Sequence, residues 1–282
     1  MKSFTDKVRL NNGVLMPHHG FGAYKLVDEN ELHRSLEAAV LAGYRLFDTA
    51  QFYHNEKYIG DFFRSSNLNR EDYFITTKVW NTEQGYDKTL KAFENSLKRL
   101  KVDYIDLYLV HWPKIEPFFE TWKALERLYD KGLIRAIGVS NFEAHHLDRL
   151  MTKANVLPAV DQLETHPYFP NHLLHRYLEE LGIVHQAWSP LGRGVALKEP
   201  ALKKIGKKYG KTPAQIVLRW HVQNDVSVIP KSENPDRIRE NADIYDFELS
   251  REEMLIIQKL NRGERVSHAP DVVYVRTEPE EF

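Results

Sequence analysis

Short apolar runs rich in strand-favouring residues recur along the chain and are separated by longer amphipathic stretches. The runs lie at residues 18–24, 44–50, 73–79, 104–111, 136–141, 159–164, 183–189 and 226–230. Between them, stretches such as 29–43, 86–100 and 118–132 carry apolar residues at spacings of three and four, typical of helices that bury one face. This alternation predicts parallel strands joined by right-handed crossovers and covered on the outside. We therefore expect an α/β fold, an eight-stranded parallel (β/α)8 TIM barrel, in preference to an open doubly wound sheet.

The two ends of the chain depart from this alternation. Residues 8–17 predict a short hairpin around Asn12 and Gly13, because both residue types tolerate the positive φ that tight turns require. The polar tail from residue 262 to 282 is expected to lie over the barrel rim or to be partly disordered. The length suits one such barrel and no low-complexity linker interrupts it, so residues 1–282 are expected to form a single domain.

Composition narrows the classes of function. Lysine and arginine nearly balance aspartate and glutamate, giving a formal net charge of −1, which argues against nucleic-acid or polybasic membrane binding. The chain has no cysteine, which excludes disulfides, thiolate metal sites and a cysteine nucleophile. The N-terminus carries no signal-like apolar core and no run approaches the roughly 18 apolar residues of a membrane span, so a cytoplasmic location is expected.

Polar residues follow several of the expected strands, where barrels form their active sites. Asp48 ends the second strand, Tyr53 lies in the loop after it, Lys78 ends the third strand and His111 ends the fourth. Each alone has a structural explanation, such as a helix-capping aspartate or a satisfied polar histidine. Lys78 is less easily explained because it follows the apolar run FITT, where an ammonium needs a partner, and Asp48 can supply it.

The structural alternative for these residues is a buried ion pair without chemistry. Against it stands Tyr53, whose ordinary pKa of about 10 falls if a cation is held nearby. Lowering that pKa by two units needs about 2.7 kcal/mol, which a close ammonium in a poorly solvated pocket can supply. The set then predicts an acid, its activating cation and a counter-ion, with His111 placed to orient a carbonyl oxygen.

Five stretches of the sequence, spread over essentially the whole chain, resemble the aldo-keto reductase superfamily: residues 43–56, 76–80, 107–113, 131–142 and 229–241. Residues 209–221 are similar to microbial reductases of the 2,5-diketo-gluconate type. The resemblance implies a catalytic tetrad of Asp48, Tyr53, Lys78 and His111. It implies reversible reduction of aldehydes or ketones, with hydride passing from a nicotinamide to the carbonyl carbon while Tyr53 protonates the oxygen.

Gly20-Phe21-Gly22 lacks the third glycine of a Rossmann fingerprint, so a dinucleotide must be bound in another way. The resemblance implies which residues would bind it. Side chains at strand ends would hold the nicotinamide, a turn-rich loop would contact the pyrophosphate, and a basic pocket would take a 2′-phosphate. NADP(H) is therefore expected, with NAD(H) used less efficiently. The implied residues are Ser140, Asn141, Gln162, Trp188, Ser189, Pro190, Leu191, Gly192, Lys231, Ser232, Asn234, Arg237, Glu240 and Asn241.

Two positions depart from the family pattern. Asn234 stands where related reductases often carry a basic residue, which predicts a modest preference for NADPH. Asp161 stands where asparagine is common and adds a carboxylate whose direction the sequence leaves open. A small carbonyl or alcohol is the expected substrate, possible types being keto-aldehydes, keto-sugars and keto-acids. Its expected walls are Tyr24, Phe52, Trp80, His111 and Trp112.

Two other classes of function remain open. A metal-dependent hydrolase is one, although the 13 histidines show no compact ligand spacing at successive strand ends, and no metal site is assigned. A regulatory subunit that binds a nicotinamide cofactor is the other, and the complete tetrad argues against it. The resemblance implies a monomer, and no sustained heptad or large exposed apolar stripe is evident in the sequence.

Overall fold

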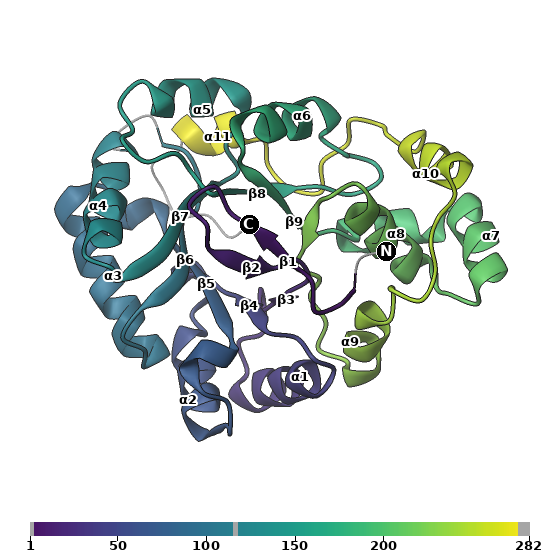
Figure 1. Ribbon diagram of the computed structural model, residues 1–282, viewed down its shortest axis with the longest axis horizontal. Helices are drawn as coiled ribbons and strands as arrows, with labels where there is room; N and C mark the ends of the chain where they lie inside the picture. Colours follow the sequence, from purple (N-terminus) through teal and green to yellow (C-terminus); the bar gives the residue numbers. More distant parts are fainter. Residues whose placement is uncertain (1–2, 115–117, 276–282) are drawn as a thin grey trace.

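The computed structural model describes residues 3–114 and 118–275, and its centre is a closed sheet of eight parallel strands (Figure 1). The strands run β3 to β10 in chain order around the sheet. Closure comes from a parallel bridge between His19 and Val228 and from the Gly22 N–H, which donates to the Pro230 carbonyl oxygen at 3.1 Å. The predicted barrel is confirmed. Its strands are β3 (Phe21–Gly22), β4 (Leu46–Asp48), β5 (Phe74–Val79), β6 (Ile105–Val110), β7 (Ile134–Ser140), β8 (Val160–Glu164), β9 (Val184–Trp188) and β10 (Ser227–Val228).

Helices surround the sheet in the order that the amphipathic stretches predict (Figure 1). Most of their apolar faces pack with the outward side chains of the strands into one hydrophobic cluster, whereas those of α7, α8 and α10 form a second cluster with Ala187 and Val228. Two helices, α7 and α8, separate β9 from β10. The helices are α1 (Glu29–Leu41), α2 (Glu56–Ser65), α3 (Tyr86–Leu100), α4 (Phe118–Asp130), α5 (Ala144–Met151), α6 (His172–Leu181), α7 (Pro200–Tyr209), α8 (Pro213–Gln223), α9 (Pro235–Ala242), α10 (Arg251–Gln258) and α11 (Pro270–Val275).

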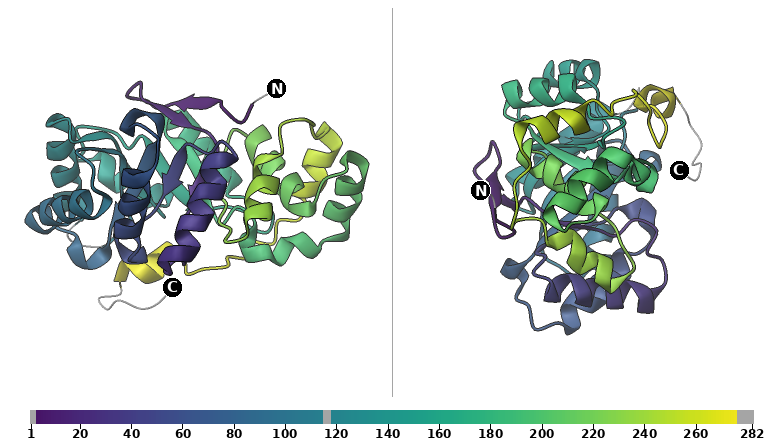
Figure 2. Two further views of the ribbon diagram at one scale, coloured as in Figure 1. Left: turned by 90° about the horizontal axis from the view of Figure 1, so that it is seen from below. Right: turned by 90° about the vertical axis from the view of Figure 1, so that its right-hand side faces the viewer.

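The expected hairpin forms from β1 (Lys7–Arg9) and β2 (Leu15–Pro17), which pair antiparallel. Only Gly13 in its turn has positive φ, at 87°, so the loop uses the glycine and not the asparagine for this conformation. Figure 2 shows the hairpin at one end of the barrel and α11 at the opposite end.

The tail runs along the rim as the sequence predicts, as far as it is described. The Arg262 and Glu264 N–H groups donate to the Tyr168 carbonyl oxygen, and the Val266 N–H donates to Glu164 Oε1 at 2.5 Å. Arg265 forms an ion pair with Glu143 at 2.5 Å. The rest of the expected tail, residues 276–282, lies outside the described residues.

Within the described part of the chain, every helix is too short or too polar to cross a lipid bilayer.

Candidate active site

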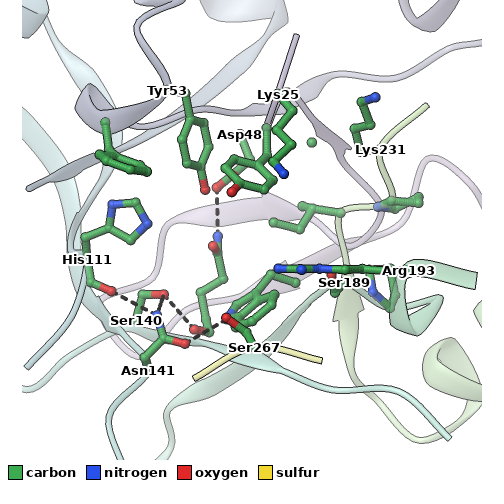
Figure 3. A pocket seen from close by; sticks show the side chains of 18 of the residues that line it. Lys25, Asp48, Tyr53, His111, Ser140, Asn141, Ser189, Arg193, Lys231 and Ser267 are labelled. Atoms are coloured by element: carbon green, nitrogen blue, oxygen red, sulfur yellow. Dashed lines mark hydrogen bonds between the residues drawn. The ribbon is translucent and has the colours of Figure 1, made fainter. Parts of the chain in front are cut away.

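A cavity of about 320 Å³ opens at the carboxyl ends of the strands, the end that carries the active site in barrels of this kind (Figure 3). Its wall combines aromatic rings, a few buried polar groups and three cationic side chains. The lining residues are Gly22, Tyr24, Lys25, Asp48, Phe52, Tyr53, Trp80, His111, Trp112, Ser140, Asn141, Gln162, Trp188, Ser189, Pro190, Leu191, Arg193, Ile229, Pro230, Lys231 and Ser267.

Lys78 lies fully buried beneath this cavity and joins two of the expected tetrad residues. Its ammonium donates to Asp48 Oδ1 at 2.7 Å, to the Thr49 carbonyl oxygen at 2.9 Å and to the Tyr53 hydroxyl oxygen at 3.4 Å. The second Asp48 oxygen, Oδ2, accepts from Gln162 Nε2 at 2.7 Å. All three ammonium hydrogens and both carboxylate oxygens are thus used, which is the condition under which a buried ion pair persists.

The electrostatics of Tyr53 correct one expectation. Burial raises the pKa of Tyr53 well above its ordinary value, and the negative charge of Asp48 raises it further. The expected lowering by Lys78 is therefore wrong, because Asp48 stands close enough to offset the ammonium and the pocket is poorly solvated. Burial acts on the pair itself too, raising the pKa of Asp48 and lowering that of Lys78, while their contact opposes both shifts. Tyr53 is accordingly a neutral phenol at neutral pH.

The His111 ring lies edge-on to the Tyr53 ring, with ring centroids 5.7 Å apart. Burial, and then the charge of Lys78, lowers the pKa of His111 well below its ordinary value, so the imidazole is neutral. Phe52 and Trp80 pack edge-on against it. Its Nδ1 has no hydrogen-bond partner among the described residues. A neutral imidazole donates one N–H, which suits it to orient a carbonyl oxygen.

The residues expected at the nicotinamide end form one hydrogen-bonded group. Ser140 Oγ donates to the Gln162 carbonyl oxygen at 2.8 Å, and Asn141 Nδ2 donates to Ser140 Oγ and to the His111 carbonyl oxygen. The Trp188 indole N–H donates to Asn141 Oδ1 at 2.8 Å. Gln162 Nε2 also donates to Gln186, at 2.8 Å, which leaves its Oε1 to accept from a carboxamide. The indole is thus fixed by its edge at the cavity wall.

The Asp161 side chain, one of the two departures from the family pattern, does not point into the cavity. Along β8 the inward side chains are Val160 and Gln162, and the strand alternation turns Asp161 toward the surrounding helices. Burial raises the pKa of Asp161 well above its ordinary value, because the charged carboxylate is poorly solvated there. It is not among the lining residues of the cavity described above.

The turn-rich loop after β9 contributes three of its four expected residues to the lining, Ser189, Pro190 and Leu191. The fourth, Gly192, is not part of the lining; it has φ 55°, and an added Cβ would lie 3.0 Å from the His166 ring. Its N–H donates to the Ser189 carbonyl oxygen at 2.7 Å, so it holds the loop's shape. The sequence reasoning missed Arg193, which lines the cavity from the same loop.

The expected 2′-phosphate residues divide into two groups. Lys231 lines the cavity, and its ammonium pairs with Glu233 at 2.7 Å. The Asn234 N–H donates to Ser232 Oγ at 3.1 Å, and Asn234 Oδ1 caps α9 by accepting from the Asp236 and Arg237 N–H groups. These contacts fix the turn that leads from β10 into α9.

The other three residues expected on α9 lie away from the cavity lining. Arg237 is exposed, Asn241 is buried, and Glu240 Oε1 accepts from Thr212 Oγ1 at 2.6 Å. Glu240 therefore has a structural contact at the start of α8, which a sequence motif alone does not reveal.

The five residues expected to surround the substrate all line the cavity. Phe52 and Trp80 stack with centroids 4.0 Å apart, and the Tyr24 ring lies 4.9 Å from that of Tyr53. Trp80 and Trp112 pack with Val273 of α11, so the tail closes the wall that they form.

Several lining residues were missed: Lys25, Ser267, Ile229 and Pro230. Lys25, with φ 63°, follows Tyr24 directly, so a cation beside an expected wall residue was an available signal. Ser267 carried no local signal, because only the path of the tail brings it to the cavity.

One group of three side chains among the described residues has the spacing of a metal site, and it lies outside the cavity lining. Asp271 of α11 contacts the His145 and His146 imidazoles of α5 at 2.9 and 3.2 Å. His146 Nδ1 accepts from the Glu143 N–H at 3.0 Å, so Nε2 carries the proton of the neutral ring and is poorly placed to ligate a metal. The contact is better explained as an attachment of the tail.

Comparison with known proteins gives a consistent result over nearly the whole chain. Residues 19–262 match the sequence model of the Aldo/keto reductase family. The chain is 50% identical to the glyoxal reductase of Bacillus subtilis (strain 168) over 269 residues, which cover 95% of this chain and 98% of that protein.

Solved structures agree in fold. An aldo-keto reductase enzyme from a Medee basin deep-sea metagenome library is 42% identical, with a TM-score of 0.92 over 96% of this chain and 100% of that one. A Bombyx mori aldo-keto reductase in complex with NADP is 32% identical, with a TM-score of 0.89 over 96% of this chain and 97% of that one.

Proposed function

Because the chain belongs to the aldo/keto reductase family, we propose that it reversibly reduces aldehydes and ketones to alcohols with NADPH, and that Tyr53 is the proton donor. The observation that carries the proposal is the contact of Lys78 with Tyr53. Since the ammonium donates to the phenol oxygen, the hydroxyl hydrogen is directed away from Lys78 and can be donated to a carbonyl oxygen in the cavity. The same ammonium stabilises the phenolate that remains.

Other side chains of the cavity orient the carbonyl group, hold Lys78 in place and exclude water. The His111 imidazole, neutral and oriented by Phe52 and Trp80, donates to the carbonyl oxygen and holds it near the Tyr53 hydroxyl. Asp48 keeps Lys78 charged and in place. The aromatic rings exclude water, which strengthens both interactions.

The lining is chemically suited to a dinucleotide. Hydroxyl and amide groups of Ser140, Asn141 and Gln162 stand at one end for a carboxamide, and cations stand at the other for phosphates. Figure 3 shows Lys231 and Arg193 on the side of the cavity away from His111. When bound, the nicotinamide supplies hydride to the carbonyl carbon.

Small aldehydes are the substrate class that we propose first. The similar protein from Bacillus subtilis is named a glyoxal reductase, and the aromatic wall completed by Val273 limits the room beside Tyr53. Keto-sugars and keto-acids remain as the comparison substrates. We also propose that the protein is active as a monomer, and light scattering during size-exclusion chromatography tests this.

The test is the loss of NADPH absorbance with glyoxal, methylglyoxal and keto-sugars, for the native protein and for Tyr53→Phe. Because positioned proton transfer contributes about 100- to 10,000-fold, we expect kcat to fall by that order while NADPH still binds. Tyr24→Phe is the matched control, since it removes a second cavity hydroxyl from a ring 4.9 Å away and should cost far less. A fully active Tyr53→Phe protein would overturn the assigned role, and absence of any turnover would favour the cofactor-binding regulatory subunit.

A further inference from the structure

The cation expected to meet a 2′-phosphate is already engaged by a neighbouring carboxylate. Lys231 follows β10 and lines the cavity, and its Nζ lies 2.7 Å from Glu233 Oε2. The hydrogen bonds between Ser232 and Asn234 fix the turn that separates the two residues. Neither Lys25 nor Arg193, the other two cations of the lining, has an ion pair among the described residues.

Glu233 is negatively charged when a cofactor arrives. Its contact with Lys231 holds the pKa of its carboxyl below the ordinary value, and Arg237 acts in the same direction more weakly. Both partners remain accessible, with the Lys231 side chain 33% and the Glu233 side chain 60% exposed. The pair can therefore open when a stronger anion competes for the ammonium, at a modest cost.

The two nicotinamide dinucleotides differ at this end of the cavity by one group. A 2′-phosphate carries close to two negative charges, so it must displace Glu233 from Lys231 or lie beside a like charge. A 2′-hydroxyl carries no charge and can donate to a carboxylate, the use that dinucleotide-binding proteins make of an acidic residue. The same side chain thus opposes one cofactor and tolerates or assists the other.

We propose that Glu233 is a specificity-determining residue that lowers the preference of this protein for NADPH over NADH by competing for Lys231. This inference rests on the proposed function, since it presupposes that the cavity binds both cofactors. It differs from the expectation based on Asn234, because Asn234 caps α9 and Glu233 is the residue that contacts the cation.

The test is direct binding, read from the fluorescence of the cavity tryptophans during titration with NADPH and with NADH. Glu233→Gln keeps the size of the side chain and removes its charge. We expect the ratio of the NADH to the NADPH dissociation constant to rise roughly three- to tenfold, the size of one nearby charge at a partly exposed site. The gain should shrink in high salt, because exposed charges are screened.

Asp236→Asn is the matched control. It removes a carboxylate from the first turn of α9 that pairs with Arg239 instead of Lys231, so the ratio should stay unchanged. In a Lys231→Met background, Glu233→Gln should lose most of its effect, because the competition acts through the ammonium.

The outcomes separate the inference from the proposed function. If the native protein binds both cofactors and reduces aldehydes but Glu233→Gln leaves the ratio unchanged, or shifts both affinities equally, Glu233 has no role in selection and only the inference fails. An equal change in the Asp236→Asn protein would also overturn it, because the effect would then be one of overall charge. If the native protein binds neither cofactor, both proposals fail.

Discussion

At the scale of single residues, the protonation state of Tyr53 depends on two buried charges, those of Asp48 and Lys78. Asp48 and Tyr53 both lie within hydrogen-bonding distance of Lys78 in a region with little solvent, so the two charges act strongly on each other and on the phenol. The sequence predicts which residues lie at the strand ends, where active sites form. It does not give the distances between their charged groups, and those distances determine the direction of a pKa shift. This is why the direction of the Tyr53 pKa shift was predicted wrongly.

The raised pKa of Tyr53 predicts different pH dependences for the two directions of the reaction. Carbonyl reduction needs the neutral phenol, which is present at every pH below the raised pKa, so Tyr53 should leave the reduction rate flat between about pH 6 and 9. Alcohol oxidation needs the phenolate, whose fraction increases about tenfold per pH unit in that range. Initial rates in both directions across this range check the prediction, and a reduction rate that falls with a midpoint near pH 8 would contradict it.

Removing the buried cation should cost both stability and activity. Lys78→Met leaves Asp48 as an unpaired buried carboxylate, so we expect the free energy of unfolding to fall by about 3–5 kcal/mol and turnover to be lost. Urea unfolding followed by fluorescence measures the first effect.

The control for this prediction is Lys78→Met combined with Asp48→Asn, which removes both charges. It should recover most of the stability without recovering turnover, because Tyr53 still lacks the ammonium that stabilises its phenolate. A double variant as unstable as the single one would mean that packing, and not the unpaired charge, causes the loss.

At the scale of the elements, close approaches between neighbours determine which substitutions are tolerated. In α2, a Cβ added at Gly60 would lie 2.4 Å from the Arg99 carbonyl oxygen and 2.6 Å from that of Leu100, at the end of α3. The two helices can pack at this distance only because the position has no side chain. The amphipathic pattern predicted that helices would cover the strands, but not that two of them meet through backbone.

Gly60→Ala should therefore destabilise the protein by about 2–4 kcal/mol, although the same change in an exposed helix stabilises it by about 1 kcal/mol. Arg64→Ala, at an exposed position of the same helix, should stay within about 0.5 kcal/mol of the native protein. Thermal unfolding of the two variants makes the comparison. A Gly60→Ala protein more stable than the native one would show that α2 shifts without strain.

The tail contributes an apolar contact to the wall of the cavity. Val273 of α11 is 1% exposed and packs with Trp80 and Trp112. Val273→Ala should raise the KM for small aldehydes roughly two- to fivefold, because it removes two methyl groups from the wall, and should leave the NADPH dissociation constant unchanged. Steady-state kinetics test this, and a change confined to NADPH binding would place α11 at the cofactor end instead.

At the scale of the whole molecule, closure of the barrel buries histidines whose charged form the fold cannot solvate. Burial lowers the pKa of His19 to about 3 and that of His221 to about 3. His19 lies at the bridge that closes the sheet, and His221 Nε2 donates to the Pro190 carbonyl oxygen at 3.0 Å, beneath the loop that lines the cavity. Both rings are neutral in the folded protein at neutral pH.

This predicts a loss of stability as pH falls. The unfolded chain binds a proton at each histidine below about pH 6.5, whereas the folded chain does so only near pH 3, so protons favour unfolding throughout that window. By pH 4 each buried histidine should cost about 3 kcal/mol of folding stability. His221→Gln keeps a hydrogen-bond donor for the Pro190 carbonyl oxygen and cannot take up this proton. The variant should therefore lose about 3 kcal/mol less stability between pH 7 and pH 4 than the native protein. Urea unfolding from pH 7 to pH 4 measures it, and an unchanged slope in the variant would contradict the assignment.

The sequence by itself determined the barrel and the hairpin, and it predicted that Asp48, Tyr53, Lys78, His111 and several aromatic residues would meet at one rim. These follow from local rules: side-chain periodicity defines strands and helices, eight parallel units close on one another, and the carboxyl ends of the strands then meet at one rim. Lys78 after an apolar run and Asp48 at the end of the neighbouring strand were therefore expected to pair, and they do so at 2.7 Å.

Only the tertiary structure decided what depends on distances between segments far apart in the chain. The path of the tail brings Ser267 and Val273 to the cavity, and the strand alternation turns Asp161 away from it. The direction of the Tyr53 pKa shift and the capture of Lys231 by Glu233 depend on a few ångströms between charges. Electrostatic and packing energies vary steeply over such distances, whereas the patterns of a sequence specify only which elements form and in what order.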